Sequence, residues 1–332
     1  MIAGQELRLR QLRRLRQIRK IAGLLTALSL LVVLLSAWLR LDAAGLGCAD
    51  WPACYAQLLS SEPTAQTFGP LRLLHRAAAS LALLLACYLA WLCWRRPSLP
   101  SPAGPASVLV MLVLALAVLG LWSSDPRLVL VAFLNILGGL GLVSFSWRVV
   151  LASTPGEMVP GAQCGHCGHA EDREHSPRSP IWRSLVLRLG AAALSLTMIL
   201  GALIGARYEA LACRSLPDCA GHWWPTAAGW AVLQEFAVLA SPPPTGEAGG
   251  LSLHLLHRWG ALLTLVLLGS AGWQALADVA TRKAAAAMLL LLTAQVSLGV
   301  LTVISGLTLW LAVAHAGCAA VLLATLVSLL RR

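Results

Sequence analysis

Three histidines lie inside long apolar stretches of this sequence, where an ionisable side chain is costly and usually serves a function. His75 and His257 follow the start of their stretches by a few residues, and His315 lies at a similar depth in the last one. An imidazole from each of two facing helices can ligate both axial positions of a haem iron. A single buried histidine is usually a hydrogen-bonded core residue, but three at matched depth favour ligation. Zinc is the weaker alternative, because two histidines leave its coordination incomplete.

An arginine follows each of the first two histidines, in the segments RLLHR and HLLHR. Arg76 and Arg258 are therefore placed to neutralise haem propionates near the membrane surface. His315 follows His257 by 58 residues (315 − 257), whereas the corresponding place in the first half, 60 residues after His75 (135 − 75), holds Asn135. An amide is a poor iron ligand. Haem held by His75 alone would have an open iron face, which suits reaction at iron; the other interpretation is that this half has lost its haem.

The elements that position these residues are predicted from the overall composition. The mean hydropathy is +0.76 and only 12% of residues are charged, too few to cover the surface of a soluble protein of 332 residues. A bilayer requires about 20 apolar residues for each spanning helix. Such runs begin at eight places: near Ile21, Leu71, Ser107, Leu128, Leu185, Leu251, Ala284 and Leu307. The sequence therefore predicts an all-α integral membrane protein with eight transmembrane helices.

The formal net charge of +11 is distributed in a way that indicates membrane topology. Seven of the 25 basic residues precede the first apolar run, within residues 1–20, and most others lie in loops that share one side if the spans alternate. This positive-inside pattern predicts cytoplasmic N and C termini in a bacterial-type inner (plasma) membrane. We interpret the basic residues 1–20 as a tail that faces lipid headgroups before an uncleaved anchor, and not as a nucleic-acid site.

Several landmarks occur twice in the same order. Cys48 and Cys54 have counterparts 165 residues later in Cys213 and Cys219 (213 − 48; 219 − 54), and the two LLHR segments are 182 residues apart (257 − 75). This repetition indicates an internal duplication. The predicted domains are the tail 1–20, an N-terminal four-helix half 21–150, a cytoplasmic linker 151–183 and a C-terminal four-helix half 184–332. Because each half has an even number of spans, we expect two tandem bundles related by a pseudo-twofold axis along the membrane normal.

The cysteines fall into two chemical settings. Both C-x5-C pairs lie in predicted outer loops, where an oxidising compartment favours the disulfides Cys48–Cys54 and Cys213–Cys219; exchangeable thiols that admit electrons are the alternative. The predicted linker contains the segment CGHCGH, with candidate metal ligands at Cys164, His166, Cys167 and His169. Their spacing is tight for one zinc tetrahedron, so an unstructured linker and a regulatory or adventitious metal site are both open interpretations.

The segments GLGCADWPAC, LLHR in both halves, AQVSLGVLTV around Gln295 and AVAHAGCAA resemble the haem A synthase family of cytochrome oxidase assembly proteins. The resemblance implies oxidation of a methyl group of haem O to the formyl group of haem A for a terminal oxidase. It also implies that His257 and His315 are the axial ligands of a haem b, and that His75 binds the substrate haem in the N-terminal half. The partners expected are haem O, the enzyme that makes it, the terminal oxidase assembly machinery and membrane lipid, with homo-oligomer formation a further option.

The N-terminal half departs from the family pattern at three places. Arg72 stands where the family has an acidic residue, Asn135 stands where it has a second histidine, and the third span has no counterpart of Gln295. The missing carboxylate removes an obvious proton acceptor for catalysis, which would centre on His75 and Asn135. Two other functions are therefore alternatives for this chain. One is a non-catalytic haem-binding assembly or delivery factor, and the other is a cytochrome b-like carrier of electrons between a membrane quinol and a partner.

Overall fold

A computed structural model describes residues 2–43, 69–95, 102–122, 128–154, 181–234 and 248–331. Within these ranges the regular structure is helical, apart from one isolated bridge between Cys219 and His222. The helices are α1 (Ile2–Ala43), α3 (Pro70–Trp94), α4 (Ala103–Leu119), α5 (Val129–Ala152), α6 (Ile181–Ala206), the 3-10 turn η2 (Glu209–Leu211), α7 (Ala227–Gln234), α8 (Ala248–Ala275), α9 (Arg282–Ile304) and α10 (Leu309–Leu330).

Seven helices in the described part of the chain are long and apolar enough to cross a membrane: α1, α3, α5, α6, α8, α9 and α10. These confirm seven of the eight predicted spans. The run that begins near Ser107 forms α4, which is apolar but only 17 residues long. At 1.5 Å per residue it rises about 26 Å, slightly less than the roughly 30 Å of bilayer hydrocarbon.

The basic residues near the N-terminus belong to the same helix as the first span. Arginine, leucine and glutamine dominate this segment, and all three have high helix propensity. Arg14 donates hydrogen bonds to the carbonyl oxygens of Leu92 (2.6 Å) and Cys93 (3.1 Å) in the last turn of α3. The last carbonyls of an α-helix point beyond its own hydrogen-bond ladder, so a cation at this place caps α3 and fixes it against α1.

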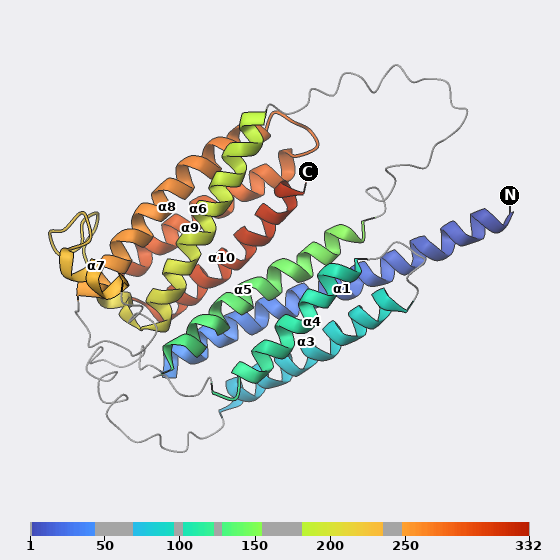
Figure 1. Ribbon diagram of the computed structural model, residues 1–332, viewed down its shortest axis with the longest axis horizontal. Coiled ribbons are helices and arrows are strands. Elements are labelled where there is room, and N and C mark those ends of the chain that lie inside the picture. Colours follow the sequence, from blue (N-terminus) through green and yellow to red (C-terminus); the bar gives the residue numbers. More distant parts are fainter. Residues whose placement is uncertain are drawn as a thin grey trace.

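The helices pack in two similar rings. The first ring consists of α1, α3, α4 and α5, and the second ring consists of α6, α8, α9 and α10. α1 contacts α3 and α5, and α4 completes the ring by contacting the same two helices; α8 contacts α6 and α9, and α10 contacts the same pair. In Figure 1 both chain ends point toward one end of the molecule, and α7 lies at the other. His257 on α8 and His315 on α10 therefore belong to helices that face each other across a ring, with α6 and α9 between them.

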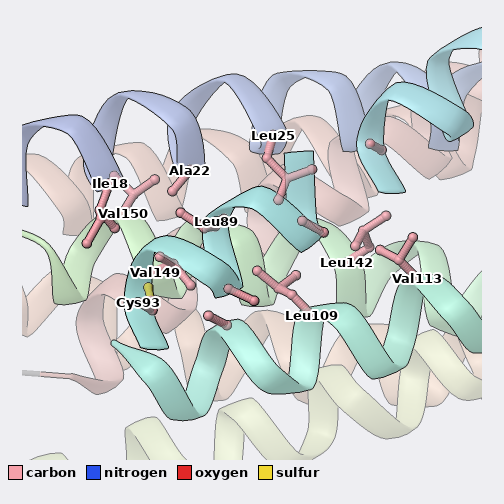
Figure 2. Packing of buried hydrophobic residues seen from close by; sticks show 14 residues of the cluster. Ile18, Ala22, Leu25, Leu89, Cys93, Leu109, Val113, Leu142, Val149 and Val150 are labelled. Carbon is pink, nitrogen blue, oxygen red and sulfur yellow. The ribbon is translucent and has the colours of Figure 1, made fainter. Parts of the chain in front are cut away.

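Small and aliphatic side chains fill the first ring. Figure 2 shows Ile18 and Leu25 of α1 packed with Leu89, Leu109 and Val149 from the other three helices, all of them fully buried. Hydroxyl groups inside the helices are satisfied locally, as their apolar surroundings require. For example, Ser29 and Ser144 donate to the carbonyl oxygens four residues earlier, at 2.6 and 2.9 Å.

The two rings meet through α1 and α5 on one side and α6 and α10 on the other. Leu140 and Val143 of α5 are buried against Ala320 and Ala324 of α10. The Trp147 indole N–H donates to the Ser328 hydroxyl at 2.8 Å across the same boundary. Packing and a polar contact thus hold the rings in one arrangement.

Candidate functional site

His257 is held by the neighbouring helix α6. Its Nδ1 lies 2.9 Å from the backbone carbonyl oxygen of Thr197, so Nδ1 carries the proton and donates it to that oxygen. A Cβ at Gly201, one turn further along α6, would lie 3.0 Å from Cε1 of His257 and 3.3 Å from Nδ1. The missing side chain therefore lets the ring approach the helix. With Nδ1 protonated, Nε2 keeps its lone pair, which is the tautomer that a metal-ligating histidine needs.

His315 is positioned by α9 in a comparable way. Its Nε2 lies 3.1 Å from the side-chain nitrogen of Gln295. Gly299 is one turn after Gln295, and a Cβ there would lie 3.2 Å from Cε1 of His315. Two buried atoms of this pair, Nδ1 of His315 and Oε1 of Gln295, have no hydrogen-bond partner among the described residues. Unsatisfied polar atoms at this depth are costly and typically mark a site that takes a ligand.

The two imidazoles lie in the same ring of four helices, His257 held by α6 and His315 by α9. Within the described part of the chain, no three His, Cys, Asp or Glu side chains gather as a metal site. A zinc ion needs about four ligands and would find only two here. A haem iron needs only two axial ligands, because the porphyrin supplies the other four. The donor set in the second ring therefore fits haem.

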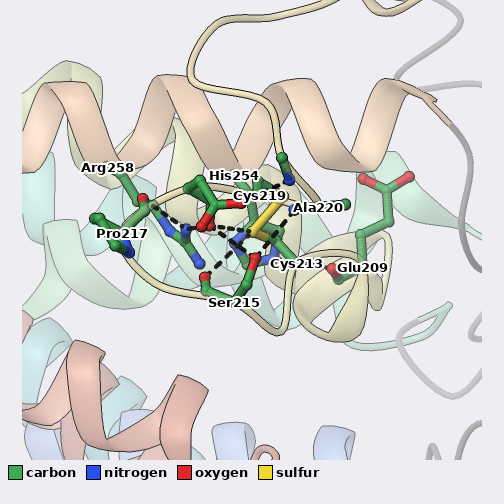
Figure 3. Close-up of a disulfide and its surroundings, with 10 residues drawn as sticks. Glu209, Cys213, Ser215, Pro217, Cys219, Ala220, His254 and Arg258 are labelled. Carbon is green, nitrogen blue, oxygen red and sulfur yellow. Dashed lines mark hydrogen bonds between the residues drawn. A yellow bond between two sulfur atoms is a disulfide. The ribbon is translucent and has the colours of Figure 1, made fainter.

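Arg258 connects this region to the outer loop. Its Nη1 donates to the carbonyl oxygens of Asp218 (2.8 Å) and Pro217 (3.3 Å), inside the loop closed by the disulfide Cys213–Cys219 (Figure 3). Its Nη2 is buried and has no partner among the described residues. One side of the guanidinium thus holds the loop in place, and the other remains available to an anion next to His257.

Sequence reasoning missed a fourth membrane-level histidine, His254. Only 7% of its surface is exposed, and Nε2 lies 3.0 Å from the Glu209 carbonyl oxygen, which tethers η2 to α8. The Glu209 carboxylate itself accepts from Arg207 Nε at 3.0 Å in a buried ion pair. The offset of 182 residues between the halves could have indicated His254, because it makes His254 the counterpart of Arg72 (254 − 182). Arg72 is the position at which the first half has no acidic residue.

In the first ring, His75 lies on α3 and Asn135 on α5, both half-buried. The counterpart of Gln295 is Leu116, by the offset that relates Leu119 to Leu298 (298 − 119 = 179; 295 − 179 = 116). Leu116 fills space against α5, and a Cβ at Gly138 would lie 2.6 Å from it. The first ring therefore replaces both members of the Gln295–His315 pair. Arg72 and Arg76 follow the start of α3 within two turns.

Other residues that the sequence indicated lie outside the described ranges. These are the first cysteine pair, Cys48 and Cys54, and the CGHCGH segment with Cys164, His166, Cys167 and His169.

The fold and site together define a class: a multi-pass, all-helical membrane protein with two tethered histidines on facing helices. Comparison with known proteins narrows this class. A family model described as COX15-CtaA, cytochrome oxidase assembly protein, matches residues 74–327. The chain therefore belongs to the COX15-CtaA family of cytochrome oxidase assembly proteins.

Individual relatives agree with this assignment. A protein from Shewanella oneidensis named heme A synthase is 33% identical over 329 residues, which cover 91% of this chain and 92% of the relative. Another of the same name, from Symbiobacterium thermophilum, is 28% identical over 88% of this chain and 87% of its own length. A third, from Sphingopyxis alaskensis, is 29% identical over 47% of this chain and 42% of its own length.

Proposed function

We propose that this protein is a haem A synthase, which oxidises a methyl group of haem O to the formyl group of haem A for assembly of a terminal oxidase. The observation that carries the proposal is the His257–His315 pair. Both rings are tethered by neighbouring helices, glycines give both of them room, and the chain around them matches a haem-processing family. Haem O is the substrate, supplied by the enzyme that makes it, and the terminal oxidase assembly machinery receives the product.

Each residue has a role in this proposal. His257 and His315 would hold haem b by their Nε2 atoms, and for His315 this would require the Gln295 amide to rotate away from Nε2. Arg258 offers its buried Nη2 to a propionate. Conversion of a methyl to a formyl group with oxygen from water releases four electrons and four protons (R–CH3 + H2O → R–CHO + 4 H⁺ + 4 e⁻), so an external electron acceptor must take the electrons. A doubly ligated haem b, when bound, would supply one-electron transfer toward that acceptor.

In the N-terminal half, His75 is the proposed ligand of the substrate haem, and Arg76 the proposed propionate partner. Asn135 would not supply a second strong ligand to that haem, which would suit reaction at its iron. A second candidate function rests on the same residues. Because Leu116 and Asn135 replace the pair found in the other half, the first ring fits equally a protein that carries or delivers haem, or passes electrons, without oxidising it.

The arrangement in the membrane is part of the proposal. We infer eight spans in two tandem four-helix halves related by an axis along the membrane normal, since the two rings have the same packing order. α4 is then the eighth span. Both termini are placed in the cytoplasm of a bacterial inner membrane, supported by the basic residues of α1 and by chain ends that point the same way (Figure 1).

The decisive experiment is expression of the full chain with a source of haem O, followed by extraction and chromatography of the haems. Haem A formed only with the intact chain supports the enzyme, whereas unchanged haem O contradicts it and favours the carrier. An optical spectrum tests the haem b site separately. We expect one low-spin haem signal that disappears in His257→Ala and in His315→Ala; its persistence in both variants would exclude this ligand pair.

A further inference from the structure

Arg40 is an intramembrane cation that reaches from one ring of helices to the other. It lies in the last turn of α1, and its Nη1 donates to the carbonyl oxygen of Gly205, near the end of α6, at 2.5 Å. That hydrogen bond is the only one that Arg40 makes among the described residues. The acidic residue nearest in sequence, Asp42, is exposed. A guanidinium has five N–H donors, so most of them remain available.

The position of Gly205 relates Arg40 to the haem b site. A Cβ at Gly205 would lie 3.3 Å from Nη1 of Arg40, and a Cβ at Gly201 would lie 3.0 Å from Cε1 of His257. Residues four apart in a helix lie on nearly the same face, about 6 Å apart along the axis. The Arg40 guanidinium therefore lies one turn beyond the His257 ring along the same face of α6, toward the end of the molecule where Arg258 holds the outer loop.

The surroundings of Arg40 favour an anionic ligand. The carboxylate of Glu209, on the turn after α6, is already bound to Arg207 in a buried ion pair. Ile136 of α5 closes the other side, because its Cδ1 lies 3.6 Å from the Cβ position at Gly205. A half-buried guanidinium, beside the Gly205 carbonyl oxygen and the Tyr208 phenol and with no carboxylate partner among the described residues, is stabilised when an anion neutralises it.

We propose that Arg40 binds a propionate carboxylate of the haem held by His257 and His315, so that the C-terminal haem site is completed by a residue of the N-terminal half. The inference rests on the proposed function. It assigns this haem two cations from different halves: Arg258, beside His257 on α8, and Arg40, which reaches the same level from α1. The haem carboxylates then bridge the two halves, which gives the boundary between them a role in binding.

The test compares two probes, iron protoporphyrin IX, whose two propionates are ionised carboxylates, and its dimethyl ester, in which both are replaced by uncharged methyl esters. Full-length protein from haem-limited cells is titrated with each, and the low-spin absorbance gives both affinities. We expect the wild type to prefer the free acid. In Arg40→Gln this preference falls about tenfold, the size expected for a lost charge-assisted hydrogen bond, while affinity for the ester is unchanged.

Matched variants separate binding from folding. Arg14 also caps a helix C-terminus, that of α3, but at the opposite end of α1, so Arg14→Gln should leave the preference unchanged. Arg40→Lys keeps the charge and should keep part of the preference. Gly205→Ala pushes on the guanidinium and should lower the preference without removing the cation, which keeps the test open if Arg40→Gln does not fold.

The outcomes are distinguishable. Equal weakening for both probes, or an unchanged preference in Arg40→Gln and Gly205→Ala, would overturn the assignment of Arg40 while leaving haem binding intact. No low-spin signal from the wild type with either probe would overturn the haem b site itself.

Discussion

Gly201 provides a sharp test of the haem b site, because the missing side chain leaves space for the His257 ring, the proposed haem ligand. Replacement by alanine places a Cβ 3.0 Å from Cε1 and 3.3 Å from Nδ1 of His257, where ordinary contacts are 3.4 Å or more. The ring cannot move away freely, since Nδ1 is hydrogen-bonded at 2.9 Å to Thr197 on the same helix. Either this hydrogen bond lengthens or α6 and α8 separate.

The expected magnitude follows from opposing effects. Overpacking of this kind costs about 1–3 kcal/mol. Alanine in the middle of a helix recovers about 0.5–1 kcal/mol relative to glycine. For the free energy of unfolding, the balance lies between no change and a loss of about 2.5 kcal/mol. The gain in helix propensity is the same with and without haem, so haem affinity responds only to the overpacking at the His257 ring. A displacement of the ring that costs about 1–2 kcal/mol to reverse lowers haem affinity about 5- to 30-fold in Gly201→Ala.

The assay is a haem titration of the full-length protein followed by low-spin absorbance, with thermal unfolding measured in parallel. Gly269→Ala is the matched control, because Gly269 lies on α8 and a Cβ there meets no atom within 4 Å. The control should bind haem as the wild type does and be equally or slightly more stable. If Gly201→Ala bound haem as tightly as Gly269→Ala, the ring would not be held as described.

Three further predictions address other parts of the chain. Asn135→His should add a second low-spin haem signal that depends on His75; an unchanged spectrum would show that the first ring does not bind haem there. Cys213→Ser should remove the disulfide to Cys219 and lower the free energy of unfolding by about 2 kcal/mol, the chain-entropy estimate for so short a loop. Complete loss of haem in this variant would contradict a role of the disulfide that is confined to its loop. Burial raises the pKa of the Tyr208 phenol, an effect that Arg40 partly opposes. The contribution of this phenol to stability should thus be constant below pH about 10, where unfolded tyrosine ionises, and fall above it. The measurement is the difference in phenolate absorbance between the wild type and Tyr208→Phe during alkaline titration of the folded protein; a difference that appeared at the ordinary pKa would contradict this.

Much of the architecture could be predicted from local sequence. Apolar runs of about 20 residues cannot satisfy their backbone in lipid except as helices, so seven spans were predictable at nearly their observed places. The remaining run, near Ser107, was predicted as a span on the same grounds, but its helix, Ala103–Leu119, is only 17 residues long. The basic residues before Ile21, predicted as a tail that faces lipid headgroups, lie in the same helix α1 as the first span, because arginine and leucine extend a helix easily once a neighbouring segment has nucleated it.

The sequence by itself determined the membrane class, the repeat and the histidines at matched depth, since hydropathy and spacing are properties of the chain. Only the tertiary structure showed how those histidines are held. Thr197 lies 60 residues from His257, and Gly201 and Gly205 look like ordinary glycines of an apolar helix. Arg40 follows the first apolar run in the sequence, yet it contacts Gly205, 165 residues away. Contacts of this kind depend on which faces of the helices pack against each other. Packing across the whole molecule determines those faces, and no local sequence pattern encodes it.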